Sequence, residues 1–200
     1  MPRSAAASHS RSLALHILFI CTGNICRSPI AERLTDLYAR LIPVHNLSAS
    51  SAGTNAVVGN PIHPYAAEVI EKFGGESFPF AARDHDPRMS SEADLVLTMT
   101  RLQRDLVLAS TPRLLRRTFT LSEAAVLASK FTPRSVEELA VLRPHLQRRE
   151  AVDIPDPIGR RPEFFAQVGR QIADLLPPLV ELAWSMDRID VAVNSRASVN

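Results

Sequence analysis

The chain has 200 residues, 46% of them hydrophobic, which suits a single domain with a sizeable core. Its formal net charge of +2 is too small to indicate a nucleic-acid partner or an acidic membrane surface. Two cysteines are too few for a secreted disulfide scaffold, and no second Cys or His pair completes a zinc-ligand pattern. We therefore expect neither a metal nor another cofactor.

The two ends of the chain differ from its middle in composition. Residues 1–14 are rich in Ala, Ser and Arg, and we expect a disordered tail there, because the short apolar run that follows is not succeeded by a cleavage-like segment. Residues 15–184 are predicted to form the domain, and residues 185–200 a loose tail. No stretch is long enough to span a membrane, so we expect a cytoplasmic protein. We also expect a monomer.

The first predicted elements are a strand, a loop and a helix. The apolar run from 16 to 20 suits a strand buried on both faces, and Cys21 follows it directly. Ser28 is expected to cap a helix whose first turn holds Pro29, where the missing N–H costs nothing. Apolar residues at helical spacing then continue to Leu41. The loop between Cys21 and the helix therefore lies over a helix N-terminus.

This loop has the residues of an anion site. The N–H groups of a helix N-terminus attract anions, and Gly23 allows successive loop N–H groups to point inward. Arg27 presents a planar fork that matches two phosphate oxygens. The same positive field favours the thiolate form of Cys21, which places a nucleophile beside a bound phosphate. The predicted binding loop comprises Thr22, Gly23, Asn24, Ile25, Cys26 and Ser28.

The rest of the chain alternates strands with helices, which predicts a parallel sheet covered on both faces. The fold class is a three-layer α/β fold with a four-stranded parallel sheet, and Cys21 falls at the carboxyl end of a strand, where ligands bind in such folds. One or two extra helices are expected after the fourth strand, over 122–150. The remaining strands are predicted at 45–51, 94–99 and 117–121, and further helices at 64–73, 100–109, 162–176 and 179–184.

A stiff loop late in the chain holds the candidate acid. Two prolines exclude a helix or a central strand over 153–159, and this segment carries two carboxylates. Cleavage of a phosphate ester by a thiolate leaves an oxygen that needs a proton, which a carboxylic acid can supply. Asp156, between two prolines, is the candidate. Asp153 is the weaker one, because isoleucine follows it.

The segment Cys21-Thr-Gly-Asn-Ile-Cys-Arg-Ser-Pro29 resembles the active-site signature of the low-molecular-weight protein tyrosine phosphatases. The resemblance implies a flavodoxin-like fold and hydrolysis of protein phosphotyrosine through a phosphocysteine intermediate. It supports Asp156 as the acid, and it implies that Asn24 holds the loop in shape with Ser51 as its partner. Ser28 is also expected to hydrogen-bond the Cys21 thiolate and to improve it as the leaving group when the phosphocysteine breaks down. The resemblance also implies a phosphotyrosine protein as partner, such as a bacterial tyrosine kinase.

The sequence departs from that family at the rim of the expected site. Ile158 and Gly159 stand where many relatives have an aromatic pair, and Ala56-Val57-Val58 stand where relatives have an aromatic residue. Ile25 replaces the threonine of phosphoarginine-specific relatives, which favours phosphotyrosine. The alternatives are a protein-arginine phosphatase, an arsenate reductase that uses an external small thiol, and a non-catalytic phosphate-binding module.

Cys26 has two interpretations. It lies in the same loop as Cys21, so that an oxidised Cys21 can form a disulfide with it and be restored by reductants, which would make the enzyme redox-sensitive. Alternatively, Cys26 only fills space beneath the loop, as free cysteines often do.

Overall fold

The computed structural model describes residues 15–42, 46–147 and 149–197, so the tail predicted at 1–14 lies outside the described residues. The strands are β1 (Leu15–Cys21), β2 (Leu47–Gly53), β3 (Leu95–Thr98) and β4 (Thr118–Thr120). The helices are α1 (Arg27–Leu41), α2 (Pro64–Lys72), α3 (Pro87–Glu92), α4 (Arg101–Ser110), α5 (Leu121–Phe131), α6 (Val136–Leu142), α7 (Pro162–Leu175) and α8 (Pro177–Ala197), with 3-10 turns η1 (Pro112–Arg117) and η2 (Arg143–His145).

The four strands form one parallel sheet in the order β2-β1-β3-β4, which confirms the predicted fold class. Its register brings the carboxyl ends of the strands together, because Cys21 pairs with Gly53 and Ile20 pairs with Thr98. The loops that follow the two neighbouring strands, β2 and β3, therefore start close to Cys21.

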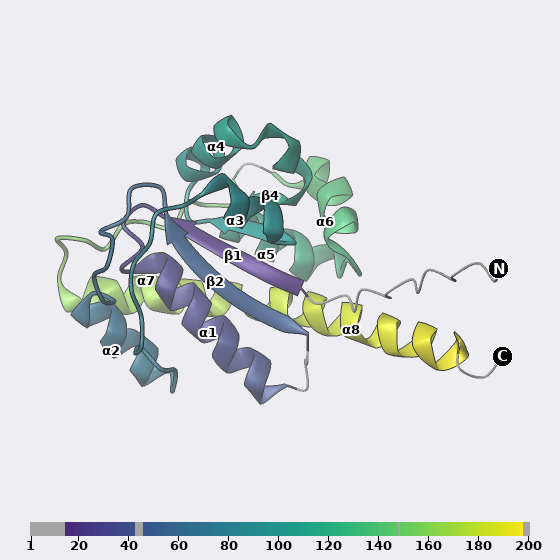
Figure 1. The fold of residues 1–200 in the computed structure, drawn as a ribbon, viewed down its shortest axis with the longest axis horizontal. Helices are drawn as coiled ribbons and strands as arrows, with labels where there is room; N and C mark the ends of the chain where they lie inside the picture. The colour runs from purple at the N-terminus through teal and green to yellow at the C-terminus, as the bar shows by residue number, and fades with distance from the viewer. Residues whose placement is uncertain (1–14, 43–45, 148, 198–200) are drawn as a thin grey trace, which may run out of the picture.

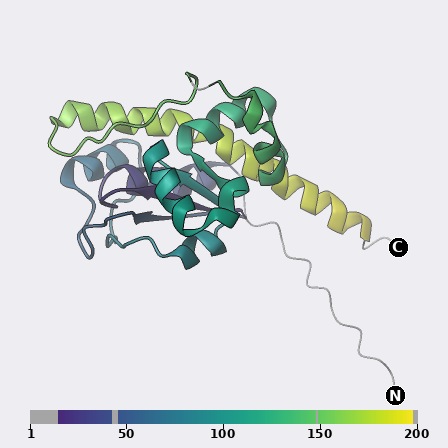
Figure 2. The same ribbon diagram turned by 90° about the horizontal axis from the view of Figure 1, so that it is seen from above.

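Helices cover both faces of the sheet (Figures 1 and 2). The larger core lies between the sheet and helices α1, α2, α5, α7 and α8, and it includes Phe19, Phe119 and Phe165. On the other face a smaller cluster packs Leu18, Ile20 and Val96 against Val107 of α4 and Met89 of α3. Apolar side chains on both faces of β1 confirm that this strand is buried on both sides.

Two helices follow β4 in the segment predicted to be helical, 122–150. Helix α5 begins with a capping box in which the Thr120 hydroxyl accepts from the N–H of Glu123 and the Glu123 carboxylate accepts from the N–H of Thr120. Helix α6 is capped by Ser135. Arg143 ties the end of this segment to the sheet, because its guanidinium lies 3.9 Å from the centroid of the Phe119 ring and donates to the Thr118 carbonyl at 2.6 Å.

The loose tail predicted from residue 185 is wrong. Helix α8 starts at Pro177, directly after α7, and it continues through Ala197. Its buried side chains keep helical spacing past Ser185, since Met186 and Asp187 are both 8% exposed. Asn46 fixes this part of the helix to the sheet by donating to the Asp187 carboxylate at 2.6 Å. No helix within the described residues is long and apolar enough to cross a membrane.

Candidate functional site

The loop between β1 and α1 lies at the carboxyl edge of the sheet, and its thiol is close to a hydroxyl. Cys21 Sγ lies 3.0 Å from Ser28 Oγ, and both residues are buried. Ser28 Oγ also accepts from Asn24 Nδ2 at 3.0 Å and lies 3.3 Å from the Ala52 carbonyl. The single hydroxyl hydrogen can turn from that carbonyl to the sulfur when Cys21 is a thiolate.

Ser28 was expected to cap α1, and that expectation is wrong. The helix begins at Arg27 with Cys26 at its N-cap position, and within the described residues it has no side-chain cap hydrogen bond. The hydroxyl of Ser28 is used for Cys21 and Asn24 instead. The N-terminus of α1 therefore has no side-chain cap, and uncapped helix N-termini attract anions.

Asn24 holds the loop in its turned shape. Its φ of 53° lies in the left-handed region that asparagine tolerates, and the residue is fully buried. Its Nδ2 donates to Ser51 Oγ at 2.8 Å, and its Oδ1 accepts from the N–H of Arg83 at 2.9 Å. The structure thus brings Asn24 and Ser51 together, as the resemblance implied.

Glu32 and Arg83 complete this support, and the sequence analysis missed both. Ser51 Oγ donates to the Glu32 carboxylate at 2.5 Å, while Arg83 Nε donates to the Ser51 carbonyl at 2.9 Å. Burial raises the pKa of the Glu32 carboxyl, and the hydrogen bond from Ser51 lowers it by less. Glu32 lies one helical turn beyond Ser28, and this spacing was the available signal.

Arg27 and Asp156 meet across 129 positions of sequence. The Arg27 side chain is 4% exposed, and it donates to the Ile154 carbonyl at 3.1 Å and forms an ion pair with the Asp156 carboxylate. Its Nε is buried and has no partner among the described residues. Asp156 is 47% exposed in its side chain and also accepts from the N–H of Ile158 at 3.1 Å. A half-exposed acid therefore lies beside the buried cation of the loop.

Asp153 has a different environment. Its carboxylate accepts from the N–H of Arg101, at the start of α4, at 3.0 Å. The neighbouring Ile154 donates its N–H to the Met99 carbonyl at 2.9 Å. This geometry assigns Asp153 to the anchoring of its own loop and leaves Asp156 as the carboxylate beside Arg27.

The two cysteines are both free and buried. Burial raises the pKa of the Cys26 thiol to about 12, and the neighbouring Cys21 adds to the shift. Cys26 is thus a neutral thiol at physiological pH. Across the residues that the structure describes, no group of three His, Cys, Asp or Glu side chains could hold a metal ion.

The rim of the loop is aliphatic. A Cβ placed on Gly23 would lie 3.6 Å from side-chain atoms of both Ile25 and Val57, so these two flank the middle of the loop. Val57 is 44% exposed and Ile158, beyond Asp156, is 49% exposed. The aromatic rings nearby belong to the packing of α2 against α7 instead, where His63 stacks on Phe165 with centroids 4.7 Å apart.

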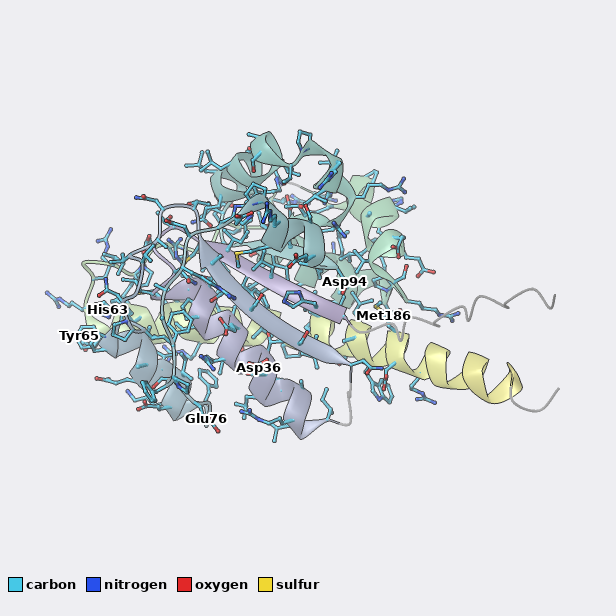
Figure 3. The ribbon with its side chains drawn as sticks, viewed as in Figure 1. Asp36, His63, Tyr65, Glu76, Asp94 and Met186 are labelled. Carbon is cyan, nitrogen blue, oxygen red and sulfur yellow. The ribbon has the colours of Figure 1, made fainter. Side chains whose placement is uncertain are left out.

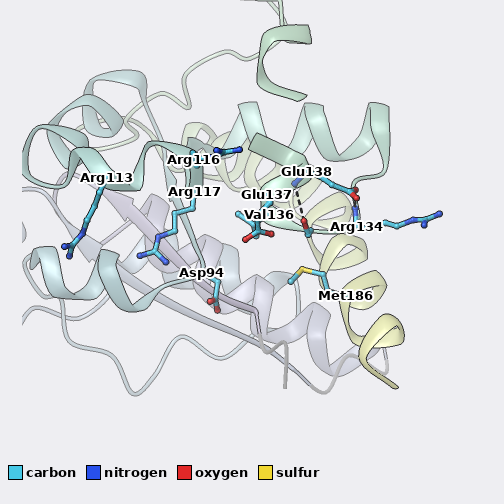
Figure 4. Close-up of a pocket in the computed structure, with 10 residues that line it drawn as sticks. Asp94, Arg113, Arg116, Arg117, Arg134, Val136, Glu137, Glu138 and Met186 are labelled. Atoms are coloured by element: carbon cyan, nitrogen blue, oxygen red, sulfur yellow. Dashed lines mark hydrogen bonds between the residues drawn. The ribbon is translucent and has the colours of Figure 1, made fainter. Parts of the chain in front are cut away.

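A cavity of about 570 Å³ lies elsewhere, near the start of β3 and the 3-10 turn η1. His63 marks the position of the Cys21 loop, because its N–H donates to the Ile25 carbonyl at 2.8 Å. Figure 3 shows Asp94 and Met186, which line the cavity, well away from His63. Arginines and glutamates both line the cavity, and the arginine side chains point in different directions (Figure 4). The candidate site is therefore the Cys21 loop, not this cavity.

Fold and site together define an α/β protein whose first strand ends in a thiol, followed by a tight loop and the N-terminus of a helix. The family model for low molecular weight phosphotyrosine protein phosphatase matches residues 16–188. A putative low molecular weight protein-tyrosine-phosphatase of Klebsiella pneumoniae is 31% identical over 156 residues, 78% of this chain and 88% of that protein. The phosphatase Wzb of Salmonella typhi is 42% identical over 83 residues, 42% of this chain and 52% of that protein.

Solved structures agree with these sequence matches. A low molecular weight protein tyrosine phosphatase from T. tengcongensis superposes with a TM-score of 0.68 at 26% identity, covering 84% of this chain and 98% of the other. The YwlE arginine phosphatase of Geobacillus stearothermophilus gives a TM-score of 0.66 at 26% identity, over 84% and 91% of the two chains. The chain belongs to the low molecular weight phosphotyrosine protein phosphatase family.

Proposed function

We propose that this phosphatase removes phosphate from protein phosphotyrosine through a phosphocysteine intermediate, with Cys21 as nucleophile. The observation that carries the proposal is the 3.0 Å approach of Cys21 Sγ to Ser28 Oγ at the positive end of α1. The hydroxyl stabilises the thiolate, and the unpaired N–H groups of the helix favour the phosphate dianion beside it. Nucleophile and electrophile are thereby held in one small volume.

In the first step the Cys21 sulfur donates an electron pair to phosphorus, a sulfur–phosphorus bond forms, and the bond to the tyrosine oxygen breaks. Asp156, in its protonated form, gives that oxygen a proton. In the second step Asp156 takes a proton from a water whose oxygen attacks phosphorus, and the bond to sulfur breaks. Arg27 and the loop N–H groups bind the non-bridging phosphate oxygens, so the residues of the chain itself neutralise their charge.

The free site requires one rearrangement before this chemistry. Arg27 donates to the Asp156 carboxylate, while its buried Nε has no partner among the described residues. A phosphate dianion offers the guanidinium a doubly charged acceptor with the geometry of a bidentate pair. In the proposal, the substrate therefore takes Arg27 from Asp156, and Asp156 turns to the leaving oxygen.

Substrate choice depends on the rim. Ile25 and Val57 flank the loop and Ile158 follows the acid, which makes an apolar but non-aromatic entrance. A tyrosine ring can pack against such aliphatic side chains. Phosphoarginine is the second candidate substrate, since the chain is also similar in fold to an arginine phosphatase. We propose a phosphotyrosine protein such as a bacterial tyrosine kinase as the partner.

A substrate panel with one active-site variant tests the proposal. The panel contains an aryl phosphate, peptides with phosphotyrosine, phosphoserine and phosphoarginine, and arsenate with added thiol. We expect the highest kcat/KM for the phosphotyrosine peptide. Cys21→Ser should bind phosphate without turnover, and retention of a tenth of the wild-type rate (about 1.4 kcal/mol in barrier) would show that Cys21 is not the nucleophile. A preference for phosphoarginine, or arsenate reduction alone, would replace the proposed substrate.

A further inference from the structure

The corner between β3 and α4, residues 99–103, contacts both loops of the site. Gln103, 4% exposed, has its amide oxygen 3.1 Å from the N–H groups of Met99 and Thr100 and accepts from both. Because only the oxygen can accept, the amide nitrogen must point the other way. That nitrogen donates to Thr22 Oγ1 at 3.0 Å. The buried amide thus connects the corner to the residue that follows Cys21.

This bond holds the Cys21 loop on its β3 side, whereas the backbone hydrogen bonds of the loop lie on its β2 side. On the β2 side the loop is fixed by four backbone hydrogen bonds, from the N–H groups of Thr54, Asn55, Val57 and His63 to the carbonyls of residues 21, 22, 23 and 25. On the β3 side, Gln103 donates to Thr22. The loop is therefore held from both neighbours of β1 in the sheet.

The same corner also holds the acid loop. Arg101 gives its N–H to the Asp153 carboxylate at 3.0 Å, and the Met99 carbonyl accepts from the N–H of Ile154 at 2.9 Å. Ile154 in turn offers its carbonyl to Arg27. Three positions beyond Asp153, the chain carries Asp156. Both loops of the site are thereby anchored to five consecutive residues.

We infer that Gln103 and Asp153 are positioning residues, which set the Cys21 loop and the Asp156 loop at a fixed distance through the β3–α4 corner. Neither touches the reacting atoms, and the inference rests on the proposed function. Each residue acts on one loop, so each has its own kinetic signature. Gln103 acts on the phosphate cradle, and therefore on phosphate affinity and on all substrates equally. Asp153 acts on the acid, and therefore on substrates with poor leaving groups.

The experiment compares Gln103→Met with Asp153→Ala, using inorganic phosphate as a competitive inhibitor and a series of aryl phosphates as substrates. We expect Gln103→Met to weaken phosphate binding about fivefold, the typical effect of one hydrogen bond, with equal rate losses across the series. Asp153→Ala should not weaken phosphate binding, and it should slow only the substrates with poor leaving groups. Asp153→Asn keeps an oxygen that accepts from Arg101 and should recover most of that loss.

Thr22→Val removes the same bond from the exposed side, which covers the case in which Gln103→Met does not fold. Its loss should not exceed that of Gln103→Met, which also leaves the N–H groups of Met99 and Thr100 without their acceptor, and the double variant should lose no more than Gln103→Met alone. Losses that multiply, or an unchanged phosphate affinity in Thr22→Val, would overturn the role of Gln103. Equal losses across leaving groups for Asp153→Ala would overturn the role of Asp153. A direct titration of inorganic phosphate into each variant, followed by calorimetry, needs no turnover, so phosphate affinity still tests Gln103 if the proposed activity is wrong.

Discussion

Replacing Asp156 with asparagine should change binding and turnover in opposite directions. In the free site Asp156 is ion-paired with Arg27, whose side chain is 4% exposed while that of Asp156 is 47% exposed. A phosphate dianion competes with that carboxylate for the same guanidinium. Asp156→Asn keeps the shape of the side chain but removes the negative charge, so it removes the competitor.

The exposure of Asp156 limits the size of this effect. Ion pairs open to solvent contribute about 0.2–1 kcal/mol, which corresponds to phosphate binding that is up to about fivefold tighter in the variant. Salt screens such a pair, so the gain should shrink as ionic strength rises. At the same time the variant cannot protonate the leaving oxygen, and rates for poor leaving groups should fall by about 10²- to 10⁴-fold.

The assay measures the inhibition constant of inorganic phosphate at two ionic strengths, and kcat for aryl phosphates whose leaving groups differ in pKa. Asp153→Asn is the matched control, because it makes the same chemical change at a carboxylate that does not contact Arg27. If phosphate affinity is unchanged or weaker in Asp156→Asn, then the Asp156 carboxylate does not compete with phosphate for Arg27. Equal rate losses for good and poor leaving groups would contradict the acid role.

Three further predictions concern the loop and its support. Arg27→Lys should lose nearly as much kcat/KM as Arg27→Ala, because lysine keeps the charge but not the fork, and near-normal kinetics for the lysine variant would contradict this. Mild peroxide should inactivate the enzyme reversibly through a Cys21–Cys26 disulfide, and Cys26→Ser should abolish recovery by dithiothreitol; full recovery of that variant would show that Cys26 only packs. Burial raises the pKa of Glu32, so the native state holds that proton more tightly than the unfolded chain, and the wild-type protein loses stability as pH rises. Glutamine has no such proton to lose, so the melting temperature of Glu32→Gln minus that of wild type should be higher at pH 7.5 than at pH 4. An equal difference at both pH values would refute this.

The part of the site that follows from local sequence was predicted well. An apolar run, a cysteine, a glycine and a proline within fourteen positions indicate a strand, a tight loop and a helix, and the structure has β1 and α1 there. Strand β2 was expected at 45–51 and is found at Leu47–Gly53, because its run of Ser and Ala carries little alternation to fix the ends.

Contacts between distant segments were harder to predict. Arg27 and Asp156 were each predicted as site residues from their chemistry, but their ion pair in the free site was not predicted and needed the fold. Ser28 was expected both to cap α1 and to hydrogen-bond Cys21; the cap is absent, Ser28 Oγ does lie 3.0 Å from Cys21 Sγ, and its second partner, Asn24, was not predicted. Gln103 was missed, although Thr100 and Gln103 have the spacing of a capping box, which was the one available signal.

Gly53 shows how a residue without any reactive group can constrain catalysis. A Cβ at this position would lie under 3.0 Å from the carbonyl oxygen of Thr22, closer than real Cβ atoms come, and a backbone carbonyl cannot rotate away as a side chain can. Any substitution must therefore separate the edge strand from the Cys21 loop. In a mutational scan scored by activity, Gly53 would tolerate substitution as poorly as Cys21. In a scan scored by protein abundance, substitutions at Gly53 would lower the score more than substitutions at Cys21. Activity scores of substitutions in this enzyme will thus depend on the residues that shape the loop as strongly as on the residues that carry its chemistry.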